Sequence, residues 1–184
     1  MGYILYRITA QPAGTQRWRV LAFYLFAANA PDLDFIPGLL IGDPNRYHHG
    51  ISHSLGFAVL FALACSLAWD IRMYEPIWRK FAIFCSLYSS HLGLDFLSID
   101  TRAPYGEPLF WPLTDAYYIA SFAFLPDIKR APSSLEFFPS LLSLHNLFAV
   151  GVELVLVFPL LMLLRRLRQP NVQAILKRIG YPKA

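Results

Sequence analysis

Four apolar stretches, separated by shorter polar ones, set the pattern of this chain. They run from about Trp18 to Ala30, Ile51 to Trp69, Phe81 to Leu97 and Leu141 to Leu164. The last is long enough for a helix to cross a hydrocarbon core of ~30 Å, which takes ~20 residues, and the second and third are near the minimum. The pattern predicts an all-α fold, an integral membrane helical bundle of about four spans.

Prolines divide the chain between these stretches. Pro31 disfavours helical geometry at Ala30, so we expect the first helix to end there and irregular backbone to follow as far as Ile41. Six prolines between residues 98 and 140 predict a structured loop at the membrane interface, with one or two short helices. Residues 1–19 lack the apolar core of a cleavable signal peptide.

Length and composition agree with a single membrane-embedded domain. The 184 residues suit one domain, here 1–184, in which 165–184 form a basic tail predicted to lie on the cytoplasmic membrane surface. The apolar fraction of 56% exceeds the ~45–50% of ordinary soluble domains. The net charge of +4 does not indicate nucleic acid, because the basic residues cluster beside apolar runs, where they suit lipid headgroups. Cys65 and Cys85 lie inside apolar runs and are expected to be small buried thiols.

The distribution of positive charge orients the predicted bundle. If four spans place both termini on one side, twelve of the sixteen basic residues fall on that side and four on the other. By the positive-inside rule, both termini are then cytoplasmic.

Three short motifs carry most of the candidate chemistry. They are Pro31-Asp32-Leu33-Asp34, the run from His48 to Ser54 (His-His-Gly-Ile-Ser-His-Ser), and His91-Leu92-Gly93-Leu94-Asp95. Each lies at the non-cytoplasmic end of a predicted span, and His145 opens the fourth span on the same side. Imidazole and carboxylate groups are the ligands of zinc, manganese and iron sites, so we predict a site for one or two Zn²⁺, with Mn²⁺ or Fe²⁺ as alternatives.

Spacing within the motifs limits how they could bind a cation. His91 and Asp95 share a helix face, which suits one metal or a ligand and its supporting partner. Asp32 and Asp34 would share a face in extended backbone, and a turn could direct both inward.

The histidine-rich motif depends on where its helix starts. His49 and His53 are also four residues apart, whereas His48 and His53 can bind together only if the helix begins between them. Ser52 and Ser54 are candidate caps for such a start.

The order of these motifs, completed by the run from Gly106 to Pro112 (Gly-Glu-Pro-Leu-Phe-Trp-Pro), resembles the bacterial inner-membrane metal-dependent hydrolase family (YdjM-like). That family has Asp-x-Asp after proline, His-Arg-Gly-x-Thr-His-Ser, His-x-x-x-Asp and Gly-Val-Pro-Leu-Leu-Trp-Pro. The resemblance covers about Ala30 to Asp115. The family is distantly similar to zinc-dependent phospholipase C and zinc nucleases, which implies a helical fold and phosphoester hydrolysis. The resemblance also implies six metal ligands: Asp32, Asp34, His48, His53, His91 and Asp95.

The chain departs from the family pattern at two points. His49 stands where the family often has arginine, and residues 1–30 lack the histidine that family members tend to carry near the N-terminus. One ligand could be missing, or another residue such as His145 could replace it. His49 and His145 are therefore further candidate ligands.

We expect a membrane-bound, metal-dependent hydrolase that acts on a lipid-borne phosphoester at the outer face of the bacterial inner membrane. Asp32 or Asp95 could serve as the catalytic general base. Arg46 and Arg102 could bind the phosphate of the substrate, although solvated loop charges are the more ordinary interpretation.

The alternative is a membrane protein without catalysis, which holds a structural or transported metal ion or binds a protein partner. A coordination position open to solvent or lipid would favour the enzyme, and a closed shell of ligands the alternative. The sequence leaves the oligomeric state open.

Overall fold

A computed structural model describes residues 1–9, 16–68 and 76–167 of the chain. These residues form helices joined by loops, and no β-strand occurs among them, only two isolated β-bridges. The all-α prediction is confirmed. The elements, where η denotes a 3₁₀ helix, are α1 (Gly2–Thr9), α2 (Gln16–Ala28), η1 (Ala30–Asp34), α3 (Phe35–Leu40), η2 (Ile51–His53), α4 (Leu55–Ala68), α5 (Ile77–Phe96), α6 (Ser134–Leu141) and α7 (Leu144–Leu167).

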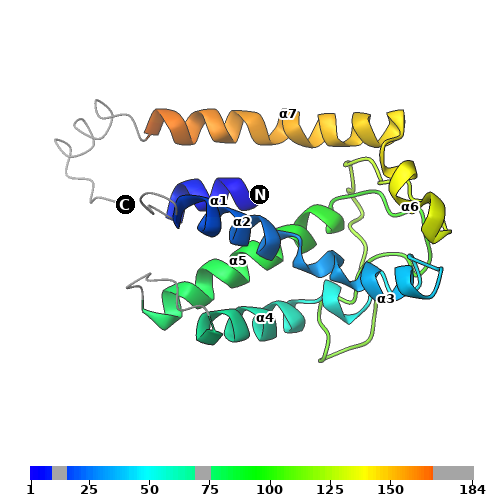
Figure 1. Cartoon of the computed structure of the whole chain (residues 1–184), viewed down its shortest axis with the longest axis horizontal. Helices are drawn as coiled ribbons and strands as arrows, with labels where there is room; N and C mark the ends of the chain where they lie inside the picture. The colour runs from blue at the N-terminus through cyan, green and yellow to red at the C-terminus, as the bar shows by residue number, and fades with distance from the viewer. Residues whose placement is uncertain (10–15, 69–75, 168–184) are drawn as a thin grey trace.

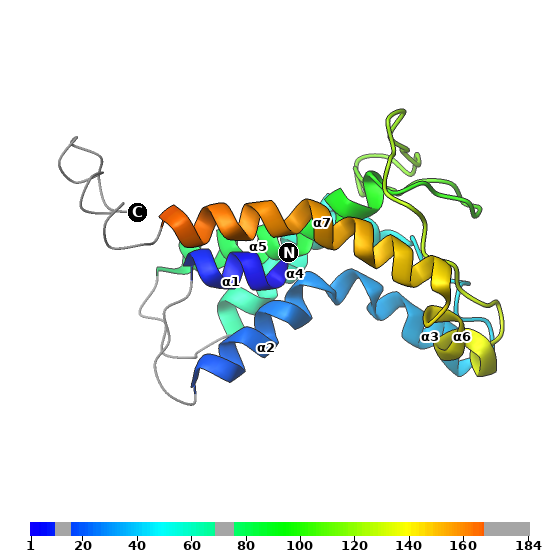
Figure 2. The ribbon, with the colours of Figure 1, turned by 90° about the horizontal axis from the view of Figure 1, so that it is seen from above.

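The longer helices run along the long axis of the molecule, and their motif-bearing ends meet at one end (Figure 1). α3, α6 and the proline-rich loop cover that end, on the right in Figure 1, and α7 leads back from it. Figure 1 shows α7 along one side of the molecule, with α1 between it and α5, so α7 overlaps α5 in the view from above in Figure 2. The sequence prediction that the three motifs share one end of the bundle is confirmed.

Aromatic and small side chains from α1, α2, α4 and α5 fill the main core. Tyr24 and Phe84 are almost fully buried, and the ring of Phe84 packs edge-on against Phe23 with centroids 5.3 Å apart. Ala27 and Ala62 are fully buried, and their small side chains let the helix backbones approach closely.

The outward faces of the helices are apolar. Leu67 on α4 and Val155 on α7 are 67% and 71% exposed. Within the described residues, one helical stretch is long and apolar enough to cross a membrane, Leu144–Leu163, with 20 residues and a mean hydropathy of 2.2. The prediction of about four spans therefore stays a prediction.

The segment after the first helix differs from what we expected. The prediction of irregular backbone from Pro31 to Ile41 was wrong, because η1 and α3 follow α2 almost without a break. Pro31 lies in the first turn of η1. Backbone N–H groups in a first turn have no acceptor within the helix, so the absence of one in proline costs no hydrogen bond, and the fixed φ of proline suits the turn. The first helix does end before this proline.

In the histidine-rich motif, the helical backbone begins between His48 and His53, as their joint binding of a cation would require. η2 starts at Ile51, after Gly50, and α4 starts at Leu55. The Ser54 hydroxyl accepts the backbone N–H of Phe57 at 3.1 Å and so caps α4, whereas the Ser52 hydroxyl is used elsewhere.

The proline-rich stretch contains one short helix, α6, as predicted. The predicted fourth stretch corresponds to α7, which continues to Leu167. Most of the predicted basic tail, from residue 168 onward, lies outside the described residues.

Candidate metal centre

η1 directs its two carboxylates to different neighbours. The Asp34 carboxylate lies against two imidazoles, with Oδ1 3.1 Å from His48 Nδ1 and Oδ2 3.0 Å from His53 Nδ1. Asp32, two residues earlier, faces the far side of the His53 ring and the ring of His91. A tight 3₁₀ turn thus separates two side chains that extended backbone would have kept on one face.

Asp34 is fixed by further hydrogen bonds. The Ser52 hydroxyl donates to Asp34 Oδ2 at 2.9 Å, and the Tyr88 hydroxyl of α5 donates to the Ser52 carbonyl at 2.8 Å. Burial acts to raise the pKa of Asp34, but its hydrogen bonds with His48 and His53 outweigh this and hold the pKa well below its usual range. An ionised Asp34 keeps the proton of His53 on Nδ1 and leaves His53 Nε2 free to bind a cation.

Four ligand atoms from three elements converge beside His53. The Nε2 atom of His91 lies 3.4 Å from Asp32 Oδ1 and 3.0 Å from Asp95 Oδ2. The Nε2 atom of His53 lies 3.8 Å and 3.5 Å from the same two oxygens. Ligand atoms bound to one tetrahedral Zn²⁺ at ~2.0–2.1 Å lie about 3.3 Å apart, so the spacing fits one cation.

The imidazole nitrogens and carboxylate oxygens of this group lie close together but do not form directed hydrogen bonds with one another. Both Nε2 atoms are buried, and neither has a hydrogen-bond partner of acceptable direction among the described residues, although carboxylate oxygens lie within reach. Buried polar atoms normally have a hydrogen-bond partner, so two such nitrogens that face the same carboxylates form a donor set suited to a cation. The residues present therefore fit a divalent cation.

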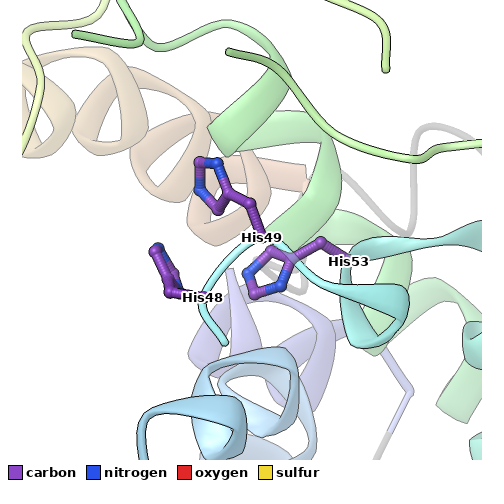
Figure 3. Close-up of side chains that lie close together, drawn as sticks. All are labelled: His48, His49 and His53. Carbon is purple, nitrogen blue, oxygen red and sulfur yellow. The ribbon is translucent and has the colours of Figure 1, made fainter. Parts of the chain in front are cut away.

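His48 lies at the edge of this group. Its ring stacks on Phe35 with centroids 4.0 Å apart, and its Nδ1 is 3.9 Å from Asp32 Oδ1. Burial is the main cause that lowers its pKa to about 4, so the ring is neutral at physiological pH. Figure 3 shows His48, His49 and His53 gathered on one turn of the chain, with ring centroids 4.2 to 5.0 Å apart.

The proposed replacement ligand lies elsewhere. His145 at the start of α7 pairs with Asp127, with Nε2 2.9 Å from Oδ1. The groups of potential ligand atoms found within the described residues do not include His145. The structure therefore does not support the alternative that His145 replaces a missing ligand, because the ring is engaged by the loop carboxylate.

Two cavities open beside the centre. The larger, about 390 Å³, is lined by Asp32, His91 and Asp95 together with Phe35, Arg130 and Val150. The smaller, about 70 Å³, is lined by Asp95, Asp100, Arg102 and Arg130. The centre is therefore open on one side, as catalytic metal sites are.

The structure separates the two predicted phosphate-binding arginines. Arg46 is exposed over the ring of Tyr47, 5.9 Å from its centroid, and does not line either cavity of the described structure. Arg102 lines the smaller cavity and donates to the backbone carbonyl of Arg130. Of the two, Arg102 lines a cavity beside the centre, and Arg46 lines neither of the two cavities in the described part of the chain.

Sequence reasoning missed Arg130, which lines both cavities. Its guanidinium lies over the ring of Phe35, 5.1 Å from the centroid, and its Nε is buried with no hydrogen-bond partner within the described chain. Burial lowers its pKa, but arginine stays charged in proteins. Asn146 holds this part of the loop through hydrogen bonds with both backbone groups of Lys129. The sequence carries no local signal for this placement.

Sequence reasoning also missed Glu107, within the motif from Gly106 to Pro112. It is 1% exposed, and burial, followed by the charge of Asp95, raises its pKa to about 9. A carboxylate inside an otherwise apolar motif could have been recognised as a site residue.

An all-helical bundle with apolar outer faces and a buried histidine–carboxylate centre at one end defines the class: a membrane protein with a candidate metal centre. The family model described as YdjM inner membrane protein matches residues 1–171, and the chain belongs to this family. No curated protein and no solved structure matches it. The resemblance to the YdjM family and the inner-membrane location expected from the sequence are confirmed, whereas the implied hydrolase activity and the distant similarity to zinc-dependent phospholipase C and zinc nucleases stay predictions.

Proposed function

We propose that this protein is a membrane-bound, metal-dependent hydrolase that acts on a phosphoester of a membrane lipid. The observation that carries the proposal is that the Nε2 atoms of His53 and His91, which have no hydrogen-bond partner among the described residues, each lie 3.0 to 3.8 Å from carboxylate oxygens of both Asp32 and Asp95. The centre also borders a cavity of about 390 Å³, which would give water and a substrate access to a catalytic cation.

Each residue of the centre has a separate task in this proposal. His53, His91 and Asp95 hold the cation, and Asp34 orients the His53 ring through Nδ1. When bound, a divalent cation supplies a water of lowered pKa and stabilises negative charge on the phosphoryl group. The Asp32 side chain is 38% exposed, against 26% for Asp95, so Asp32 is better placed to accept a proton from a water in the cavity.

The larger cavity combines charge and apolar surface in a way that suits a lipid phosphate. Arg130 supplies a buried cationic group for phosphate oxygens, with Arg102 holding its backbone. Leu94, Leu141 and Val150 line the same cavity from α5, the end of α6 and α7, and offer apolar surface to the glycerol and acyl parts of a lipid.

We further propose the predicted topology of about four spans with cytoplasmic termini and the centre at the non-cytoplasmic face. The apolar outer faces of α4 and α7 and the excess of basic residues toward the termini support it. In a background without Cys65 and Cys85, Asp43→Cys and Phe122→Cys should react with a membrane-impermeant thiol reagent outside intact cells, and Pro76→Cys should not. The reverse labelling pattern would contradict the topology.

The activity is tested with purified protein in vesicles that contain lipid phosphomonoesters and phosphodiesters. We expect headgroup or phosphate release that is lost on chelation and restored by Zn²⁺ or Mn²⁺. Asp32→Asn should lower the rate by about 10²–10⁴-fold while the protein stays folded. Absence of hydrolysis of all these lipids by the metal-loaded wild type would instead favour a structural or transported ion.

A further inference from the structure

Glu107 is a buried acid without a partner. Its side chain is 1% exposed, and neither carboxylate oxygen has a hydrogen-bond partner in the described part of the chain. A buried acid whose oxygens have no hydrogen-bond partner is unfavourable unless something compensates it. The cluster around it already contains the charge of Asp95, which makes the position still less favourable.

The backbone fixes Glu107 in this position. Its N–H donates to the Tyr118 carbonyl at 3.0 Å, and its carbonyl accepts the Tyr118 N–H at 2.9 Å. Gly106 has φ +84°, and a Cβ there would lie 2.3 Å from the Tyr118 carbonyl oxygen. The chain therefore turns sharply, at a place where only glycine fits, to bring Glu107 inside.

His49 approaches the same place from another element. Its φ of +59° is unusual for a residue with a side chain. Figure 3 shows its ring beside those of His48 and His53. His49 Nδ1 lies 3.5 Å from Asp100 Oδ2, the oxygen that also accepts the Gly106 N–H at 2.6 Å. Asp100 thus links the histidine turn to the Glu107 turn.

Ligand atoms of His49, Asp95 and Glu107 all lie within 4.8 Å of one another. One imidazole and two carboxylates form a mixed N/O set that suits Zn²⁺, Mn²⁺ or Fe²⁺. Asp95 also belongs to the centre described above, since its Oδ2 is 3.0 Å from His91 Nε2.

We propose that His49, Asp95 and Glu107 bind a second divalent cation, with the Asp95 carboxylate shared between the two cations. The proposal rests on the proposed function for the first cation, at His53 and His91. A second cation would be bound by the buried oxygens of Glu107, which otherwise have no partner among the described residues. It would also be bound by His49, which is not a ligand of the first cation. Paired cations of this kind clamp the attacking and leaving oxygens of a phosphoester.

The test is cation stoichiometry of the full-length protein loaded with Mn²⁺ in detergent, measured by elemental analysis and electron paramagnetic resonance. We expect about two Mn²⁺ per chain in the wild type, with the spectrum of a spin-coupled pair. Glu107→Gln, and separately His49→Asn, which tolerates the same backbone, should each retain about one Mn²⁺ with the spectrum of an isolated ion. The exposed Glu136→Gln and the Asp127-paired His145→Gln serve as controls and should retain two.

The outcomes separate the two proposals. Binding of one Mn²⁺ by the wild type, unchanged in Glu107→Gln and His49→Asn, overturns the second site and leaves the first intact. Failure of the wild type to bind Mn²⁺ or Zn²⁺ overturns both. If one variant does not fold, the other variant and the wild-type spectrum still decide the question.

Discussion

Two histidine–aspartate pairs have nearly the same distance between imidazole nitrogen and carboxylate oxygen, but they lie in different surroundings. His91 Nε2 is 3.0 Å from Asp95, and His145 Nε2 is 2.9 Å from Asp127. His145 makes directed contacts with both the side chain and the backbone carbonyl of Asp127, and its side chain is 33% exposed. His91 is 13% exposed, and its Nε2 has no directed partner within the described residues. A short distance alone therefore does not mark a candidate metal ligand, and we base the proposal on the convergence of ligand atoms that lack directed partners.

The largest expected effect distinguishes these two histidines directly. His91→Gln removes one of the converging nitrogens, so the purified protein should lose its cation at this centre and its hydrolytic activity. His145→Gln, the matched control, should keep both. Elemental analysis of the two variants beside the wild type makes the measurement, and equal metal loss in both would remove the distinction between the pairs.

Arg130 provides the next test, with Arg46 as its control. If the buried guanidinium binds the substrate phosphate, Arg130→Gln should lower kcat/KM by about 10–10²-fold, the value of a hydrogen bond to a charged group. Metal content should be unchanged because Arg130 is not a ligand. Arg46→Gln, at an exposed position, should leave kcat/KM as it is. A loss of metal in Arg130→Gln would mean that the residue supports the centre and does not bind substrate.

Asp34 should have a smaller effect on metal than the converging ligands. Asp34 contacts His48 and His53 through their Nδ1 atoms. The Asp34→Asn substitution therefore loosens the orientation of these rings but removes none of the four converging ligand atoms. Cation affinity should fall about 10–100-fold, as for other supporting residues. The affinity is measured by competition with a chelator of known strength. Complete loss of cation would make Asp34 a direct ligand, as the family resemblance implied.

The smallest effect is expected at the pair outside the centre. Burial acts to raise the pKa of Asp127, but Thr101 and His145 outweigh it and leave the pKa lowered. A lowered pKa contributes stability above the unfolded pKa of about 3.9, and the contribution is lost as pH falls through the folded value. Asp127→Asn should therefore lower the free energy of unfolding at neutral pH by less than about 1 kcal/mol, seen as a small decrease in Tm. The difference in stability between wild type and variant should shrink below about pH 4. A stability difference between wild type and Asp127→Asn that grows as the pH falls would contradict a stabilising, ionised Asp127.

The sequence predicted the helices and the meeting of the motifs because apolar runs and charge asymmetry are local signals. It placed Asp32, His53, His91 and Asp95 together, and the structure brings each of the two imidazoles within 3.8 Å of both carboxylates. It could not distinguish Asp34 as an orienting residue, because that depends on the 3₁₀ turn of η1. That turn replaced the irregular backbone we expected after Pro31.

The remaining errors come from long-range contacts. His145 looked like a spare ligand because it begins a helix at the correct end, but the partner that engages it, Asp127, lies 18 residues away. Arg130 is brought to the cavities by contacts of the loop with Asn146 and, through Ala131, with Asn45. No spacing rule connects such residues, so their positions had to come from the fold.

The central claim is that His53, His91 and Asp95 bind one cation, with the Asp32 carboxylate beside it. X-ray absorption at the zinc edge of Zn²⁺-loaded protein tests it most directly, in a Glu107→Gln background that isolates this centre. We predict nitrogen and oxygen ligands at ~2.0–2.2 Å, including the signature of imidazole, with the imidazole contribution reduced in His91→Gln. A sulfur shell at ~2.3 Å from Cys65 or Cys85, or a spectrum that does not change in His91→Gln, would contradict the claim.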